Sequence, residues 1–407
     1  MEAAVSEPQE RAEPEDPREQ PSEEPQWRLG RGRTVPLGEA DRELRRSWAA
    51  IDEDSRATDG EGMLRLREVN LVVVSGERDC EQARVTAALT VRDNPGRVIV
   101  VAPGGTGSSA SIATGCLIDE FSKRRVCSEE VVIQGAQGEQ EQLRAAILQL
   151  LVPDVPVVGW WTGELGKGAE KLLWLADVTD QLVTDLALAA DPRISLKVLT
   201  DLIAERPDLR LRDMEWLRVA PWRELTAELF ERRDRRLLVP EIERLEVRHQ
   251  AAPMQALLFA AWFGFRLGMS VGSGEWSGSR RTASLTMTGS APAALVVDLV
   301  REPEAESRAD GLVEVRVHLG AELDGGAPGE RECVGQAIAI SRLPHSLVCR
   351  CGTGEVFDQA VLKSSGIPEQ DDHRLLSLVI DTPVWESGLR EMLSTALELS
   401  VAPGFPA

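Results

Sequence analysis

The residues whose type and spacing best suit cofactor binding are the glycines of the stretch GTGSSA, residues 105–110. The stretch matches G-x-G-x-x-A and follows the apolar run RVIVVA, as a phosphate-binding turn follows a strand in dinucleotide folds. In those folds a helix comes next and points its N-terminus at the pyrophosphate. Residues 111–118 have a strand composition instead, and the first acids, Asp119 and Glu120, come too early to contact the ribose. We therefore interpret the stretch as a loop between strands and predict no cofactor.

Two cysteines form the next candidate group. Cys349 and Cys351 alternate with Val348 and Arg350, so both thiols are expected on one face of a strand. His345 precedes Cys349 by four residues, but no C-x-x-C pair or second histidine accompanies it at ligand spacing. We predict no metal site. The two cysteines are redox candidates, and the alternative is a pair of small buried apolar side chains.

Motifs of common catalytic sites are missing from the sequence. It contains no G-x-S-x-G, no H-E-x-x-H and no P-loop, and its four histidines are scattered. We predict no catalytic residues, so a binding protein is favoured over an enzyme. Four arginines, at 232, 233, 235 and 236, end a predicted helix. They indicate either an anionic partner or simple complementation of the helix dipole.

Adjacent tryptophans mark another segment, LVPDVPVVGWWTG, residues 151–163. Trp160 and Trp161 end a predicted strand just before a glycine turn. Neighbouring strand residues point to opposite faces, so one indole is expected in the core. The other would reach a helix layer or a partner surface, where an amphipathic ring is a common contact anchor.

Strands alternating with helices are expected to position these residues. Val69–Val74 and residues 97–102 are β-branched runs typical of strands covered on both faces. Residues 111–118 and 126–133 favour a hairpin divided by a charged turn. The pattern predicts an α/β domain over residues 39–271, built on a mostly parallel mixed sheet.

After Gly272 the pattern becomes that of an antiparallel sheet. Residues 312–319 alternate apolar and polar side chains, as in a strand with one wet face. Residues 347–351 and 375–380 are predicted as further short strands, and a helix over 384–397 is expected to pack on the sheet. We predict a smaller α+β domain over residues 272–407.

Composition excludes several classes of function. Residues 1–38 are acidic and Pro-rich, then Arg/Gly-rich, and are predicted to be disordered. The 407 residues carry 46 Lys plus Arg against 67 Asp plus Glu, a net charge of −21, which disfavours nucleic acid and anionic membrane as partners. Six cysteines are too few for a disulfide scaffold, and neither a signal peptide nor a membrane-length apolar run is visible. We expect a cytoplasmic protein.

The sequence resembles the glucose-6-phosphate dehydrogenase assembly protein family, OpcA. The resemblance covers roughly Leu66 to Leu399 and rests on the order and spacing of several segments. They are NLVVV from Asn70, NPGRVIV from Asn94, VCSEEV from Val126, LVPDVPVVGWWTG from Leu151, PWRELTAELF from Pro221, and the apolar helix containing Trp262.

This resemblance implies a non-catalytic activator of the oxidative pentose phosphate pathway. Such a protein binds glucose-6-phosphate dehydrogenase and stabilises its active oligomer. The concentration of matching segments in the α/β domain implies contact candidates at Trp160 and Trp161 and on the helix carrying Trp222 and Arg223. Some photosynthetic members of this family have redox-sensitive cysteines in their C-terminal part. Alternatives are a nucleotide-dependent oxidoreductase and a thiol-based redox sensor.

Overall fold

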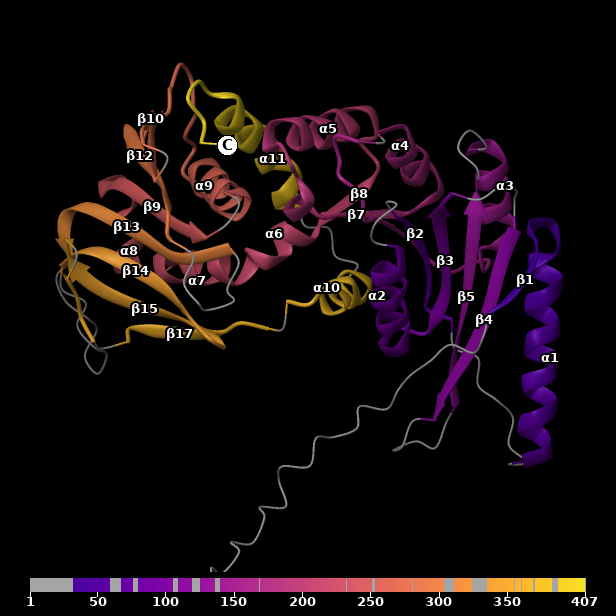
Figure 1. The fold of residues 1–407 in the computed structure, drawn as a ribbon. Helices are drawn as coiled ribbons and strands as arrows, with labels where there is room; N and C mark the ends of the chain where they lie inside the picture. Colours follow the sequence, from indigo (N-terminus) through magenta and orange to yellow (C-terminus); the bar gives the residue numbers. More distant parts are fainter. Residues whose placement is uncertain are drawn as a thin grey trace, which may run out of the picture.

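The computed structural model describes residues 32–406 apart from short gaps. The gaps are residues 59–66, 76–79, 105–108, 119–124, 136–139, 168, 232, 251–252, 280, 304–310, 324–334, 355, 360, 369 and 383–386. Two sheets, each with its own helices, lie side by side (Figure 1). Within the described part, no helix is both long and apolar enough to cross a bilayer.

The first sheet is buried on both faces. Its central strand β2 (Val69–Val74) has the sequence VNLVVV and is buried at every position, because helices cover both sides of the sheet. The strand order is β1-β4-β5-β3-β2-β6-β7-β8. The other strands are β1 (Arg33–Pro36), β3 (Gly96–Pro103), β4 (Ser109–Ile118), β5 (Arg125–Gly135), β6 (Val157–Trp161), β7 (Gln181–Thr184) and β8 (Arg210–Asp213).

The order of these strands is that of a doubly wound sheet. From β2 the chain moves outward through β3 to β5, then returns to β6 on the other side of β2, and all these neighbours are parallel. This reversal creates a switch point at the carboxyl ends of β2 and β6. Strands β4 and β5 form the predicted antiparallel hairpin.

Helices lie on both sides of this sheet. α2 (Cys80–Asp93) and α10 (Asp372–Asp381) pack together on one side, whereas α1 (Ala40–Thr58) and α3 (Gln140–Leu150) lie on the other (Figure 1). α4 (Ala169–Val178) packs on β6. The remaining helices are η1 (Leu37–Glu39), η2 (Leu186–Leu188), α5 (Pro192–Glu205), α6 (Met214–Arg218), α7 (Ala220–Glu231), α8 (Arg233–Arg236), η3 (Val239–Glu241), α9 (Met254–Arg266) and α11 (Ser387–Val401).

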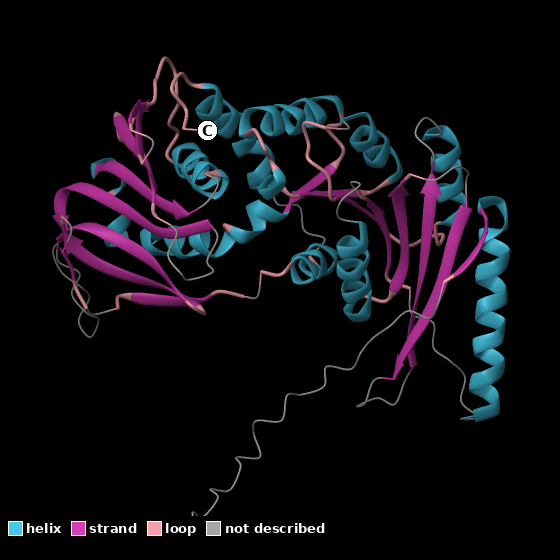
Figure 2. Ribbon diagram, in the orientation of Figure 1, coloured by secondary structure: helices cyan, strands magenta, loops and turns pink. Residues whose placement is uncertain are grey.

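The second sheet is mostly antiparallel. Its order is β10-β11-β12-β9-β13-β14-β15-β16, with β17 paired to β15, and only the pairing of β9 with β12 is parallel among these described strands. The apolar helix α9 packs against it (Figure 2). The strands are β9 (Ile242–Gln250), β10 (Ser277–Gly278), β11 (Thr282–Thr288), β12 (Ala294–Arg301), β13 (Gly311–Leu323), β14 (Gly335–Leu343), β15 (Ser346–Thr353), β16 (Val356–Phe357) and β17 (Lys363–Gly366). The predicted fold class, a mostly parallel sheet followed by an antiparallel one, is confirmed.

One predicted strand is wrong. Residues 375–380 lie in the helix α10, not in a strand. Leu375, Leu376 and Val379 are buried together against α2 of the first sheet, a spacing of three to four residues that fits one helical face. The short apolar run is ambiguous by periodicity alone, and its packing partner lies far away in the sequence.

The two sheets share the chain differently from the predicted boundary at residues 271 and 272. β9 pairs with β12 and β13 and so belongs to the second sheet, although it precedes that boundary. In the other direction, α10 returns to the first sheet. The helix α11 packs chiefly on α9 and α5. β1 begins at Arg33, inside the segment predicted to be disordered, while residues 1–31 lie outside the described part.

Candidate functional site

Trp160 and Trp161 point to opposite faces of the first sheet, as their adjacency in a strand predicts. Trp160 packs in the apolar cluster that includes Val183 and Met214, and Trp161 packs in the cluster that includes Leu165. Each side chain is only 4% exposed. Neither indole is therefore available as a surface anchor in this structure.

The other pair of contact candidates is buried as well. Trp222 lies on the inner face of α7 at 2% exposure, and Arg223 is buried beside it. The Arg223 guanidinium carbon lies 3.5 Å from the centre of the Trp216 ring, a cation–π contact between α7 and α6. All four candidates are therefore buried and can only support a contact surface from beneath. The contact surface itself must consist of exposed residues close to them.

Two glycines after β6 allow the chain to pack closely beside Trp161 and so decide which exposed residues lie near it. A Cβ atom on Gly163 would lie 2.8 Å from Trp161 Cζ2, so only glycine lets the backbone pack directly on the indole. A Cβ atom on Gly166 would lie 2.9 Å from Cγ2 of Ile194 at the start of α5. The loop after β6 is thus held between a buried tryptophan and an exposed isoleucine.

Two large apolar side chains reach solvent here. Ile194 is 52% exposed, and Leu188 at the end of η2 is 45% exposed. Ion pairs lie beside them, Lys167 with Glu164 at 2.7 Å and Arg193 with Asp191 at 3.0 Å. We call the exposed and partly exposed residues of this region the β6–β7 edge surface. Its members are Glu164, Gly166, Lys167, Leu188, Asp191, Arg193 and Ile194.

A buried ion-pair network fixes the first sheet against its neighbours. Arg218, at the end of α6, donates to both carboxylate oxygens of Asp185 at 2.8 and 3.0 Å. It also donates to Glu215 at 3.0 Å and to Asp372 of α10 at 2.9 Å. Glu215 in turn accepts a hydrogen bond from Gln255 of α9. One guanidinium therefore ties together the segment between β7 and η2, α6 and α10, and through Glu215 also α9.

Beside this network lies the carboxyl group of Asp213, which has no exposure to solvent. Asp213 accepts hydrogen bonds from Thr184 Oγ1 at 2.8 Å, from the Leu186 amide at 3.0 Å and from the Trp216 amide at 3.1 Å. Burial and the neighbouring Asp185 charge raise the pKa of Asp213 to about 8. No motif in the sequence predicts this network. An aspartate between a short strand and a helix is an N-cap signal, but nothing local indicates the distant partners.

The redox candidates lie in the second sheet. Cys349 is a free thiol buried in the apolar cluster, and burial raises its pKa to about 12. Cys351 is buried too, and its sulfur is in a disulfide bond. The two sulfurs are therefore not bonded to each other. The described residues contain no group of three or more His, Cys, Asp or Glu side chains that could hold a metal ion.

The glycine-rich stretch, residues 105–110, follows neither of the two strands that form the switch point. Residues 105–108 lie outside the described part. Ser109 and Ala110, predicted as part of the loop, are the first residues of β4, and the strand predicted over residues 111–118 is confirmed. The stretch follows β3, whereas the crevice of a doubly wound sheet opens at β2 and β6. The glycines therefore follow the wrong strand for dinucleotide binding.

Known proteins that resemble this chain are of two kinds. It is 29% identical over 191 residues to a Synechococcus elongatus protein that carries the provisional name OxPP cycle protein OpcA, covering 45% of this chain and 42% of that protein. A Synechocystis protein with the same name is 28% identical over 179 residues, covering 43% of this chain and 37% of that protein. The chain thus matches less than half the length of these curated relatives.

Solved structures resemble the chain only distantly. KijD10, a 3-ketoreductase from Actinomadura kijaniata, is 11% identical with a TM-score of 0.45, covering 82% of this chain and 95% of its own. Biliverdin reductase from Synechocystis is 10% identical, also with a TM-score of 0.45, covering 83% of this chain and 99% of its own. Likenesses of this size assign no activity to the chain.

Two family models match consecutive parts of the sequence. Residues 87–201 match the glucose-6-phosphate dehydrogenase subunit N-terminal domain, and residues 209–364 match the C-terminal domain of the same subunit. Together they cover more than half of the chain and span both sheets. The chain therefore belongs to the OpcA family of glucose-6-phosphate dehydrogenase assembly proteins.

Proposed function

We propose that this chain binds glucose-6-phosphate dehydrogenase and stabilises its active oligomer, without catalysing a reaction itself. The observation that carries the proposal is the match to both domains of a glucose-6-phosphate dehydrogenase subunit family, over residues 87–201 and 209–364. An activator of this kind must bind the active form of the enzyme better than the inactive form. A tenfold shift of that equilibrium needs a differential binding energy of about 1.4 kcal/mol.

The sequence at the switch point supports a non-catalytic role. The segment that follows β2 is SGERD, residues 75–79, with a single glycine and two acidic side chains. A dinucleotide site at this position has the pattern G-x-G-x-x-G or G-x-G-x-x-A, whose first two glycines let the chain turn tightly and the backbone approach the pyrophosphate. With Arg78 between Glu77 and Asp79, the segment has a net charge of −1 and so offers no net attraction to a pyrophosphate. This segment therefore disfavours the oxidoreductase alternative.

We place part of the contact with the dehydrogenase on the β6–β7 edge surface. Ile194 and Leu188 offer exposed apolar area, while the ion pairs of Lys167 and Arg193 give it a polar rim. Apolar anchors within a polar rim are typical of protein interfaces. Trp161 supports this surface from beneath through Gly163. The contribution of the tryptophan to binding would then be to hold the surface rigid.

The test combines sedimentation and turnover of the dehydrogenase from the same cell. Adding the purified chain should shift the enzyme to a larger species and raise its turnover. Ile194→Glu should weaken both effects at least tenfold, because it places a charge at the centre of the apolar surface. Val85→Glu is the matched control, since Val85 on α2 is 47% exposed and lies on the other side of the sheet.

The outcomes separate the function from its location. If the unaltered chain changes neither the assembly nor the turnover of the enzyme, the proposed function is wrong. If the chain activates but Ile194→Glu activates equally well, the function stands and the β6–β7 edge surface is not the contact.

A further inference from the structure

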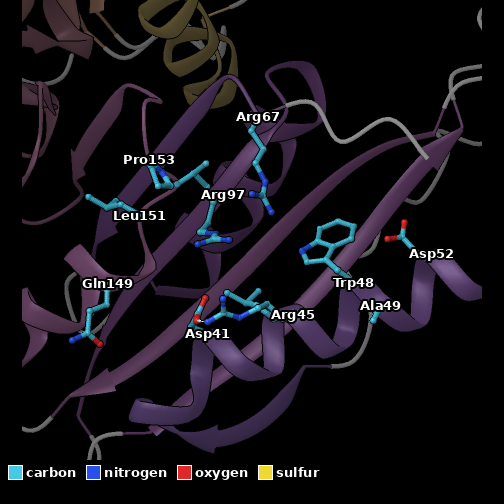
Figure 3. A pocket seen from close by; sticks show the side chains of 12 residues that line it. Asp41, Arg45, Trp48, Ala49, Asp52, Arg67, Arg97, Gln149, Leu151 and Pro153 are labelled. Atoms are coloured by element: carbon cyan, nitrogen blue, oxygen red, sulfur yellow. Dashed lines mark hydrogen bonds and ion pairs between the residues drawn. The ribbon is translucent and has the colours of Figure 1, made fainter. Parts of the chain in front are cut away.

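A cavity of about 650 Å³ lies at the amino ends of β2 and β3, between α1 and the loop after α3 (Figure 3). Arg67 comes just before β2, and Arg97 is the second residue of β3. Trp48 belongs to α1, and Gln149 comes from the end of α3. Arg67, Arg97 and Trp48 point toward one another from three separate segments of the chain (Figure 3). The volume is typical of a small-molecule site.

Glu129 of β5 contacts the side chains of Arg97, Trp48 and Arg67. Arg97 Nε donates to Glu129 Oε1 at 2.6 Å, and Trp48 Nε1 donates to Oε2 at 2.5 Å. Arg67 reaches Oε1 at the longer distance of 3.3 Å. Two guanidinium groups, those of Arg97 and Arg67, thus share the single carboxylate of Glu129, so this cluster of three side chains carries one positive charge in excess. The pKa of Arg97 is lowered, first by burial and also by the nearby Arg67 charge.

The unbalanced charge is accessible at Arg67. Its side chain is 32% exposed, and among the described residues its one ion pair is the long contact with Glu129. A guanidinium has five N–H donors, so most of those on Arg67 remain for a ligand. At the rim, Asp41 is paired with Arg45, so these two side chains add no net charge. Asp52, also at the rim, has an interaction within the protein.

We propose that this cavity binds a small phosphorylated molecule, with its phosphate on Arg67. Guanidinium forks match phosphate oxygens, and a dianion offsets the unbalanced charge better than a neutral ligand. Arg45 lies at the rim as a second guanidinium and can contact the phosphate while it stays paired with Asp41, because a guanidinium has five N–H donors. The apolar walls, Leu44 and Val152, leave room for the body of the molecule.

This site lies away from the proposed contact surface. In parallel strands the amino and carboxyl ends lie at opposite edges of the sheet, so the cavity and the β6–β7 edge surface are at opposite edges. The proposal concerns the chain alone and does not rest on its binding to the dehydrogenase.

The test is calorimetric titration of the purified full-length chain with three probes. They are glucose 6-phosphate, inorganic phosphate and glucose. Glucose 6-phosphate should bind more tightly than inorganic phosphate, and glucose should not bind. Arg67→Gln should weaken glucose 6-phosphate binding at least tenfold. Arg193→Gln is the control, because Arg193 is an exposed, ion-paired arginine at the opposite edge.

Three results would overturn the proposal. They are no binding of glucose 6-phosphate, unchanged binding in Arg67→Gln, and equal affinity for inorganic phosphate, which would mean that the cavity does not hold the body of the molecule. A melting curve checks that Arg67→Gln folds. If it does not, Arg45→Gln replaces it, because Arg45 is largely exposed, and its glucose 6-phosphate affinity should fall about threefold.

Discussion

Replacing Arg218 by Met should destabilise the chain strongly. Arg218 is the shared cation of the ion-pair network, and its side chain is 14% exposed. Removal leaves Glu215 and Asp185 buried without their cation, while the more exposed Asp372 can turn to water. Removing one partner of a buried pair costs about 3–5 kcal/mol, so we expect a loss of this size at neutral pH.

The loss should depend on pH. Burial already raises the pKa of Glu215, and the charge of Arg218 holds that rise back. Without Arg218 the folded-state pKa rises further above the unfolded value. A carboxyl group of this kind favours folding most below its unfolded pKa, and this contribution is lost as pH rises through the folded pKa. Arg218→Met should therefore cost less stability at pH near 5 than at pH near 8.

The assay is urea denaturation at both pH values, followed by tryptophan fluorescence and circular dichroism. Arg193→Met is the control, because its pair with Asp191 is exposed, and it should leave the midpoint unchanged. Equal stability of Arg218→Met and the unaltered chain would refute the role given to the network. Equal losses at both pH values would refute the explanation through buried carboxylates.

Three further predictions concern buried positions. Leu376→Ala should cost about 2–5 kcal/mol by leaving a cavity between α10 and α2, whereas Leu378→Ala on the exposed face of α10 should be near neutral in the same denaturation assay. Gly163→Ala should lower the melting temperature, since its Cβ would meet the Trp161 ring; an unchanged melting temperature would contradict this packing. Cys349 should react with iodoacetamide far more slowly than the partly exposed Cys80, as peptide mass spectrometry can check; equal rates would contradict its burial and raised pKa.

Local sequence signals predicted the elements whose surroundings follow a regular pattern over the whole length of the element. The β-branched run of β2 indicates burial on both faces, and the sheet does cover it on both sides. The hairpin β4–β5 is likewise visible from its charged turn. The opposite orientation of Trp160 and Trp161 follows from the alternation of strand residues alone.

Features that depend on distant partners could not be predicted in this way. The apolar residues of α10 look like a strand until α2 is known to lie beside them. β9 carries exposed Glu243 and Arg244 and gave no sign that it joins the second sheet. The unbalanced charge at Arg67 arises because Arg97 and Arg67 both contact the carboxylate of Glu129. Each arginine is 30 or more positions away from Glu129 along the chain. The sequence contains these charges but does not show which of them meet.

The return of α10 to the first sheet has a consequence for how the protein is made. While the ribosome is still synthesising the second sheet, the side of the first sheet around α2 has no helix to complete its cover. That apolar surface stays open until about residue 381 has emerged, and nascent chains with such surfaces are prone to aggregate. Fragments cut between residues 201 and 209, where the family models divide, would therefore lack a helix that the amino-terminal half needs.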